Sequence, residues 1–373
     1  MKRYRLLIAL FAIMAVLVAA CGGDDEGSGD GDGGDGEGLT IGVSWNNYNE
    51  ERWAKADEPA IREALEAAGA TYISTDAGSS EEQQLADVEQ LITDGADALI
   101  ILAQNGTAIL PAVQSALDQG IPVVAYDRLI EDDGAFYLTF DNVEVGRAEA
   151  RVIFDLVPEG VYAIIKGNQA DANSDFLRQG YEDVIGDAVA AGDIVICCET
   201  YTDNWDPALA QTQMEQFLTQ ENNEIDAVLS ENDGMASGVV AALEAQGLAG
   251  EIPVSGQDGD AAALNRVALG TQAVSVWKNA YALGQAAGEL AVQLAGGAEL
   301  SDVTAPDDLG AAAPEAGLDA MLFTTPGGVE VWSIILTPEP ITQDNLDVVI
   351  DSGWITQEEV CQDVAEGTVD VCG

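Results

Sequence analysis

The chain beyond residue 38 alternates short apolar runs with longer amphipathic stretches. The runs are rich in β-branched residues and almost uniformly apolar, which is typical of strands that helices cover on both faces of a parallel sheet. About ten strand–helix units are expected from this alternation. The predicted strands are 39–45, 71–75, 97–103, 121–127, 136–140, 161–167, 193–199, 226–230, 252–256, 272–277 and 331–338.

The stretches between the runs have helical spacing of their apolar residues. Regular alternation of strands and helices predicts an α/β fold with parallel sheets. Because one doubly wound sheet usually holds about five or six strands, two sheets are favoured over one. A single eight-unit barrel is the structural alternative. The irregular junction at 136–142 breaks the rhythm halfway and is interpreted as a crossing between two domains.

The first 21 residues have the pattern of an export signal. Basic residues at 2, 3 and 5 precede an apolar run, 6–18, of signal-peptide length. Val18-Ala19-Ala20-Cys21 resembles the bacterial lipobox, which predicts a lipid on Cys21 and an extracytoplasmic, membrane-anchored protein. The alternative is a transmembrane anchor, but the run is shorter than the ~20 residues that a spanning helix needs.

Residues 22–38 contain little besides Gly, Asp and Glu and are predicted to be a flexible acidic tether. The spacing of Asp and Gly there resembles calcium loops, but no aliphatic residue would hold such a loop, so no metal site is predicted. The remaining cysteines are Cys197, Cys198, Cys361 and Cys372. Three pairings are possible. Cys361 with Cys372 closes a short loop and is preferred, which leaves Cys197 and Cys198 as a strained vicinal pair or as free thiols.

The charge of the chain is extremely negative, with 13 Lys and Arg residues against 66 Asp and Glu and a net charge of −53. This charge argues against nucleic acid as a partner, because binding to nucleic acid depends on neutralising phosphates. The chain has no histidine, which excludes histidine catalysis and histidine metal ligands.

Planar polar residues and tryptophans collect just after the predicted strands. In open parallel sheets, ligands bind beyond the carboxyl ends of the strands, so these residues are candidates for a binding site. They are Trp45, Asn46, Asn47, Glu51, Arg52, Trp53, Gln104, Asn105, Tyr126, Asp127, Arg128, Asn168, Asp171, Asn173, Arg178, Asn204, Trp205, Asp206, Asn232, Asp233, Gln257, Asp258, Asp260, Trp277 and Lys278.

Removal of the signal peptide leaves only ten basic residues, and four of them belong to this set. A sugar ligand would explain why these cations lie at the ends of strands. Each hydroxyl both donates and accepts, forked guanidinium groups can hold two neighbouring oxygens, and a tryptophan ring can cover the apolar face of a pyranose. The four cations are Arg52, Arg128, Arg178 and Lys278.

Several candidates also have ordinary structural interpretations. Asp206 is expected to cap the helix that Pro207 begins, and Asp260 and Asp233 could each be helix caps. Trp277 could belong to the core. Glu51 is expected to orient Arg52 rather than to contact a ligand.

At these positions the sequence resembles the periplasmic monosaccharide-binding proteins of ABC transporters, and within them the xylose-binding branch. The resemblance runs in collinear order over nearly the whole mature chain. The matching segments are ERW (51–53), AYDRLI (125–130), FDNVEVG (140–146), DANSDFLRQG (171–180), NWDPALA (204–210), SENDGMASG (230–238), VSGQDGD (254–260), GTQAVSVWK (270–278) and ILTPEPITQDNL (335–346).

The resemblance implies a type I periplasmic binding protein fold, with two doubly wound lobes joined by three crossings. The expected lobes are 39–141 plus 279–332 and 142–278 plus 333–373. It implies binding of a monosaccharide, with D-xylose favoured, by a monomer without a cofactor that delivers the sugar to a transporter permease. The expected sugar-binding residues are Arg52, Trp53, Asp127, Arg128, Asn173, Trp205, Asn232, Asp258 and Lys278, and the expected supporting residues are Glu51, Asp171, Arg178 and Asp233.

Three rival interpretations remain for comparison. A receptor of the same fold could sense glucose, galactose or sugar acids and signal instead of importing. A lipid-anchored glycosidase would need two carboxylates that flank a bond, and Asp258 and Asp260 are too close in one loop for that design. A repressor with similar lobes would need a helix-turn-helix where the signal peptide stands.

Overall fold

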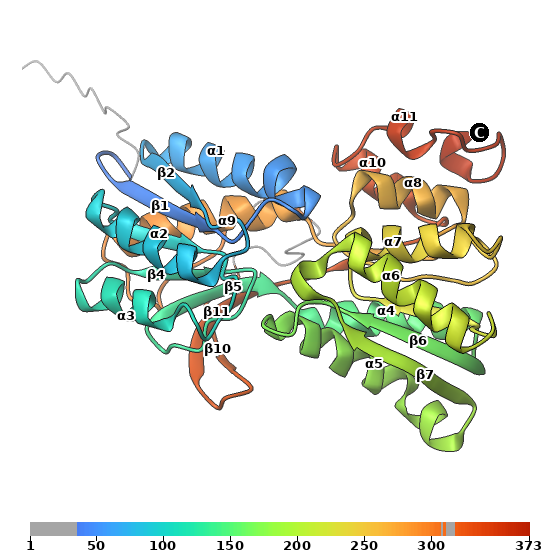
Figure 1. Ribbon diagram of the computed structural model, residues 1–373. Coiled ribbons are helices and arrows are strands. Elements are labelled where there is room, and N and C mark those ends of the chain that lie inside the picture. Colours follow the sequence, from blue (N-terminus) through green and yellow to red (C-terminus); the bar gives the residue numbers. More distant parts are fainter. Residues whose placement is uncertain (1–35, 307–308, 311–317) are drawn as a thin grey trace, which may run out of the picture. The chain divides into compact units, whose positions relative to one another are not determined.

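The computed structural model describes residues 36–306, 309–310 and 318–373 (Figure 1). The predicted signal peptide (1–21) and the predicted lipidation site Cys21 lie outside these residues, as does nearly all of the predicted tether (22–38). No helix in the described part of the chain combines the length and the apolar character that a membrane span requires.

The N-terminal lobe is built on a seven-stranded sheet with the order β10-β11-β5-β4-β3-β1-β2. All neighbouring pairs are parallel except β10 and β11, which form an antiparallel hairpin. Its strands are β1 (Thr40–Trp45), β2 (Thr71–Asp76), β3 (Ala98–Ile101), β4 (Val123–Tyr126), β5 (Ala135–Phe140), β10 (Met321–Thr324) and β11 (Glu330–Leu336).

Helices cover both faces of this sheet, which explains why its strands are continuously apolar. Along β3, Ile100 packs in a cluster with α1 and α9, whereas Leu99 and Ile101 pack with α2 and α3 on the opposite face. The helices of this lobe are η1 (Trp53–Asp57, a π-helical turn), α1 (Glu58–Ala68), α2 (Glu81–Thr93), α3 (Leu110–Asp118) and α9 (Ala280–Ala295).

The C-terminal lobe has a parallel sheet with the order β7-β6-β8, and β9 pairs with β12 in an antiparallel ribbon. Single bridges from Val228 to Val254 and from Gln257 to Val276 connect β8 to β9 through the intervening segment. The strands are β6 (Gly160–Lys166), β7 (Ile194–Tyr201), β8 (Ala227–Ser230), β9 (Ser275–Trp277) and β12 (Glu339–Ile341).

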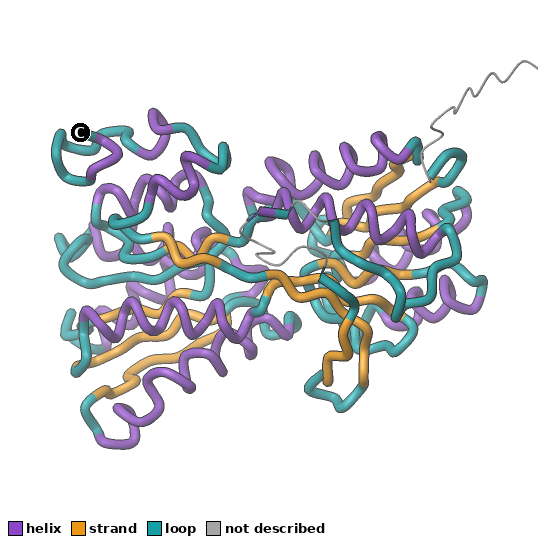
Figure 2. The backbone as a smooth tube through the Cα atoms, turned by 180° about the vertical axis from the view of Figure 1, so that it is seen from behind, coloured by secondary structure: helices purple, strands orange, loops and turns teal. Residues whose placement is uncertain are grey.

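Helices cover this second sheet as well, with α4 and α5 on one face and α6 and α7 on the other. Figure 2 shows helices on both sides of the strands in each lobe. The helical elements are α4 (Asn142–Leu156), α5 (Ala172–Ala191), η2 (Asp203–Trp205), α6 (Pro207–Gln220), α7 (Asp233–Glu244), α8 (Ala261–Leu269), α10 (Leu346–Asp351), α11 (Gln357–Val360) and η4 (Asp370–Cys372).

The chain passes between the two sheets three times, between β5 and α4, between β9 and α9, and between β11 and β12. The first two crossings lie where the sequence predicted them. The third prediction was wrong, because it assigned 333–336 to the C-terminal lobe. Ser333 to Leu336 pair with Tyr137 to Phe140 of β5, so the N-terminal lobe extends through Leu336.

The predicted strand 252–256 is also absent as a continuous strand, and only isolated bridges occur there. Pro253 has no N–H to donate to a ladder, which limits pairing at this point. The C-terminal segment packs on α8 through an apolar cluster that includes Leu264, Val267, Leu346 and Val360. A disulfide joins Cys361 to Cys372, and Cys197 and Cys198 are free thiols.

Candidate functional site

A polar pocket lies at the carboxyl ends of the strands of both lobes. Every side chain that the sequence predicted to contact a ligand lines it, together with three that were not predicted to do so. The lining residues are Glu50, Arg52, Trp53, Asp127, Arg128, Asp171, Asn173, Trp205, Asn232, Gln257, Asp258 and Lys278.

Arg52 is the buried centre of the pocket. It lies at the start of the π-helical turn η1, directly after the loop that follows β1. Its Nε and Nη2 atoms donate to the two carboxylate oxygens of Asp57, at 3.0 and 2.8 Å. Its Nη1 atom lies 3.2 Å from Asp127 and 3.4 Å from Asp258 of the other lobe. Tyr126 donates its hydroxyl to Asp57 and so fixes this carboxylate.

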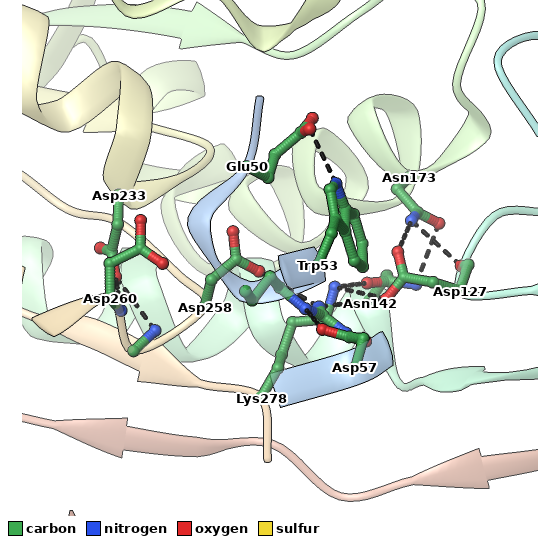
Figure 3. A network of polar contacts seen from close by, with 12 residues as sticks. Glu50, Trp53, Asp57, Asp127, Asn142, Asn173, Asp233, Asp258, Asp260 and Lys278 are labelled. Carbon is green, nitrogen blue, oxygen red and sulfur yellow. Dashed lines mark hydrogen bonds and ion pairs between the residues drawn. The ribbon is translucent and has the colours of Figure 1, made fainter. Parts of the chain in front are cut away.

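Arg128 joins both lobes in the same way. Its Nε atom lies 3.0 Å from the carboxylate of Asp171, the residue that caps α5. Its Nη2 atom donates to Glu50 at 3.1 Å. The other oxygen of Glu50 accepts from the indole N–H of Trp53 at 2.8 Å, as Figure 3 shows. Each arginine therefore contacts carboxylates of both lobes. Arg52 contacts Asp57 and Asp127 of its own lobe and Asp258 of the other, whereas Arg128 contacts Glu50 of its own lobe and Asp171 of the other.

Lys278 follows β9 and completes the cationic part of the pocket. Its ammonium group lies 3.5 Å from Asp127 and 3.4 Å from the side-chain oxygen of Asn142. Asn142 donates to the amide oxygen of Asn173, and Asn173 donates to Asp127 (Figure 3). Asp127 thus receives contacts from residues of both lobes.

The C-terminal lobe contributes amides and a tryptophan. Asn232 caps α7 by accepting from the backbone N–H of Met235. The ring of Trp205 packs against Gly167, where an added Cβ would lie 2.2 Å from the ring, so only glycine fits there. Within the described residues, Trp205 Nε1 and Gln257 Oε1 are buried without a hydrogen-bond partner.

Burial and charge act in opposite directions on the site carboxylates. Burial alone would raise the pKa of Asp127, but Lys278, Arg52 and Arg128 together lower that pKa below its ordinary value. For Glu50, Asp57 and Asp171, burial dominates and raises the pKa in spite of the nearest arginine. Of these four carboxylates, Asp127 is therefore the one whose ionised form the surrounding charges favour.

Two predicted supporting residues are elsewhere, and both predictions were wrong. Glu51 pairs with Lys55, one turn further along the chain, while Asp57 orients Arg52. Arg178 pairs with Glu199 and Glu182 outside the pocket. It lies five residues after Asn173, which turns it ~140° away around α5.

Three aspartates, Asp206, Asp233 and Asp260, were considered as helix caps in the sequence. Asp206 caps α6 as predicted, by accepting from two backbone N–H groups. Asp233 is not the cap of α7. Its buried carboxylate accepts from the backbone N–H groups of Gly259 and Asp260, each at 3.0 Å, and so holds the loop that carries Asp258. Asp260 stands at the start of α8 but makes no capping hydrogen bond with its side chain.

Two important acids were missed by the sequence analysis. Glu50 and Asp57 lie within five residues of Arg52, so their proximity was visible. Their burial was not, because Glu50 is enclosed by Arg128 and Trp53, and Asp57 by Arg52 and Tyr126. A search for carboxylates near each buried arginine would have found both, since a buried arginine needs a partner.

Comparisons with known proteins agree on one family. The model of the periplasmic binding protein domain matches residues 41–299. The chain is 37% identical over 324 residues to the D-xylose-binding periplasmic protein of Escherichia coli strain K12, covering 86% of this chain and 92% of that protein. It is 28% identical to the multiple sugar-binding periplasmic receptor of Rhizobium radiobacter, covering 96% of this chain and 100% of the receptor.

Solved structures give the same result. An ABC transporter solute-binding protein from Clostridium phytofermentans, with bound β-D-glucose, superposes with a TM-score of 0.75 and 26% identity. The match covers 86% of this chain and 99% of that protein. The two-lobed α/β fold that the resemblance implied, the type I periplasmic binding protein fold, is thereby confirmed.

Proposed function

Because the chain belongs to the periplasmic binding protein family, we propose that it captures a monosaccharide, with D-xylose favoured, for an ABC importer. The matched relatives are binding proteins and not enzymes, which argues against the glycosidase interpretation. In this proposal the mature protein is a lipid-anchored monomer outside the cytoplasm, held by Cys21, and delivers the sugar to a permease.

One observation carries the proposal: the pocket is lined by paired cations and carboxylates from both lobes, with unpaired polar atoms among them. Sugar hydroxyls can donate to carboxylates and accept from guanidinium and ammonium groups at the same time. Trp205 Nε1 and Gln257 Oε1 offer one further donor and one further acceptor. A buried polar atom without a partner calls for a ligand or a water.

The chemistry of the pocket favours a small polar ligand, because charged and amide side chains make up most of its lining. The preference for D-xylose rests on the similarity to the D-xylose-binding periplasmic protein of Escherichia coli.

Each residue has a role in this proposal. Arg52, Asp127, Arg128, Asn173, Asn232, Asp258 and Lys278 hydrogen-bond to hydroxyls, and Trp53 and Trp205 cover the ring. Asp57 and Asp171 orient the arginines, and Asp233 holds the loop of Asp258. Because the sugar contacts residues of both lobes, it binds best when the lobes are together and shifts the population toward that form.

The alternative is a receptor of the same fold that senses several sugars. The similarity to the multiple sugar-binding receptor of Rhizobium radiobacter favours it. Such a receptor would accept glucose, galactose or sugar acids and would signal to a membrane partner instead of delivering its ligand.

Isothermal titration calorimetry of residues 22–373 tests the proposal. The titrants are D-xylose, glucose, galactose, arabinose, ribose and glucuronate. Binding of D-xylose at one site per chain, at least about 100-fold tighter than the other sugars, is the expected result. Similar affinity for several sugars favours the receptor, and absence of heat with every sugar contradicts the proposal.

A further inference from the structure

A β-bulge in β7 places two neighbouring cysteine side chains on the same face of the C-terminal sheet. Tyr162 of β6 pairs with Ile196, but Ala163 pairs with Cys198, so Cys197 is the extra residue of the bulge. In a regular strand, neighbouring side chains point to opposite faces. A bulge breaks this alternation and redirects one side chain.

The packing on the two faces agrees with this geometry. Ile194 and Ile196 pack in the cluster that lies under α4 and α5. Strict alternation would place Cys198 in that cluster too. Instead Cys198 and Cys197 both pack in the cluster on the opposite face, under α6 and α7. Both thiols therefore approach α6.

A carboxylate completes the group. Glu221 directly follows the last turn of α6, and its carboxylate and the two Sγ atoms all lie within 4.8 Å of one another. A tetrahedral ion with Zn–S bonds of ~2.3 Å and Zn–O bonds of ~2.0–2.2 Å brings its ligand atoms to within about 4 Å of each other. Small side-chain rotations therefore suffice to close the three atoms around one ion.

We propose that Cys197, Cys198 and Glu221 bind one divalent ion of the zinc and cadmium class. Thiolate sulfur is the ligand type that selects such ions, and a carboxylate oxygen is a common additional ligand of Zn²⁺. Because the chain has no histidine, cysteine and acidic side chains are its strongest ligands for these metals. Solvent occupies the fourth position, and both thiol protons are released to solvent on binding.

The site is accessible and lies in a favourable field. Cys198 is buried, but Cys197 and Glu221 are only partly covered, so an ion can reach the sulfur atoms from solvent. The net charge of −53 concentrates cations near the surface of the protein. The ion would link the bulge of β7 to the end of α6, a role separate from the sugar pocket, whose lining includes none of the three residues.

Cadmium titration of reduced residues 22–373 tests the proposal. This fragment retains every residue that the structure describes and lacks Cys21, which would otherwise add a thiol. The readouts are the ultraviolet thiolate-to-cadmium absorption band and competition of Cd²⁺ with Zn²⁺. One Cd²⁺ per chain is expected, and Zn²⁺ should displace it.

Matched variants identify the ligands. Cys197→Ser and Cys198→Ser should each abolish the band of a two-thiolate site. Glu221→Gln should lower the metal affinity at least about tenfold. Even the loss of a residue that only hydrogen-bonds to a metal ligand typically lowers metal affinity by about 10–100-fold. Glu215→Gln, which changes an exposed acid of α6 bonded to Gln211, should leave binding unchanged. Circular dichroism of each variant verifies the fold.

Three results would overturn the proposal. The first is the absence of a band while thiol titration finds both cysteines free. The second is a band that persists in the double serine variant. The third is that the purified, unreduced protein contains no titratable thiols and gains two on reduction at this pair, which would identify a vicinal disulfide in place of a metal site.

Discussion

The two lobes contribute different chemistry to the pocket. The N-terminal lobe supplies both arginines, and it holds each of them with an acid of its own, Asp57 for Arg52 and Glu50 for Arg128. The C-terminal lobe supplies amides, Trp205 and the acids Asp171 and Asp258, which reach the arginines from across the pocket. The two arginines are thus held by acids of their own lobe. The other lobe adds Lys278 and the acids that contact the arginines from across the pocket.

This difference separates folding from ligand capture. Contacts inside the N-terminal lobe stabilise the lobe whether or not a sugar is present. Contacts across the pocket form only when the lobes are together, so in the proposed function they contribute to the equilibrium between open and closed forms. Substitutions in the two groups should therefore change different measured quantities, and the predictions below follow from the largest expected effect to the smallest.

Arg52→Ala removes a residue that takes part both in the contacts inside the N-terminal lobe and in the contacts across the pocket. Sugar affinity should fall at least about 100-fold, and the free energy of unfolding should fall by ~3–5 kcal/mol, because three buried carboxylates each lose one cationic contact and Asp57 loses its only ion pair among the described residues. Calorimetry and urea denaturation measure the two effects. Arg62→Ala, which breaks an exposed pair with Glu58, is the control and should cost under ~1 kcal/mol. An unchanged affinity would contradict a role of Arg52 in binding.

Asp57→Asn weakens only a contact inside the N-terminal lobe, whereas Asp258→Asn weakens only a contact across the pocket. Asp57→Asn should lower the free energy of unfolding by ~1.5–3 kcal/mol, the usual contribution of hydrogen bonds to charged groups. Asp258→Asn should lower the sugar affinity by about tenfold, or ~1.4 kcal/mol, with a smaller change in stability. The comparison fails if both variants change stability and affinity in the same proportion.

Asp233→Asn should change how stability depends on pH. Burial raises the pKa of Asp233 to about 7, against the opposing effect of Arg266. The folded protein then holds this proton more tightly than the unfolded chain does. Between about pH 4 and 7, the wild type should lose up to ~1.4 kcal/mol per pH unit from this group as pH rises. Urea denaturation across that range should show a shallower decline for Asp233→Asn; parallel curves would argue against a raised pKa.

Arg178→Ala should have the smallest effect. The side chain pairs with Glu182 and Glu199 outside the pocket, so sugar affinity should stay within about twofold of the wild type and stability within ~1 kcal/mol. Calorimetry against the same sugar is the measurement. A large loss of affinity would return Arg178 to the binding site, as the sequence had suggested.

The alternation of apolar runs predicted most of the fold because covered strands and their helices have local signatures. The bulge in β7 and the third crossing between the lobes have no such local signature in the sequence. Residues 331–338 read as one strand, and nothing local shows that its first part pairs with β5 and that the chain changes lobe after Leu336. The prediction of a strand at 252–256 was wrong for a reason that the sequence does contain, because Pro253 has no N–H to donate to a neighbouring strand.

Position directly after a strand was enough to predict which side chains come together in the pocket, as for Arg52, Arg128, Asn173, Asn232, Asp258 and Lys278. It was missed where partners are chosen by tertiary packing. Glu51 was expected to orient Arg52 because it is adjacent in sequence, but the π-helical turn η1 brings Asp57 to the guanidinium instead and leaves Glu51 to Lys55. Sequence distance is a poor guide inside such a turn.

The position of β11 in the N-terminal sheet matters while the chain folds. β11 lies between β10 and β5, yet the strands β6 to β9 of the other lobe come between β5 and β11 in the chain. Until β11 joins the sheet, β5 presents an unpaired hydrogen-bonding edge, which is a template for pairing with other partly folded chains. Mutual repulsion between such strongly acidic chains opposes that pairing. The same charge that surrounds the finished protein therefore also protects its unfinished forms.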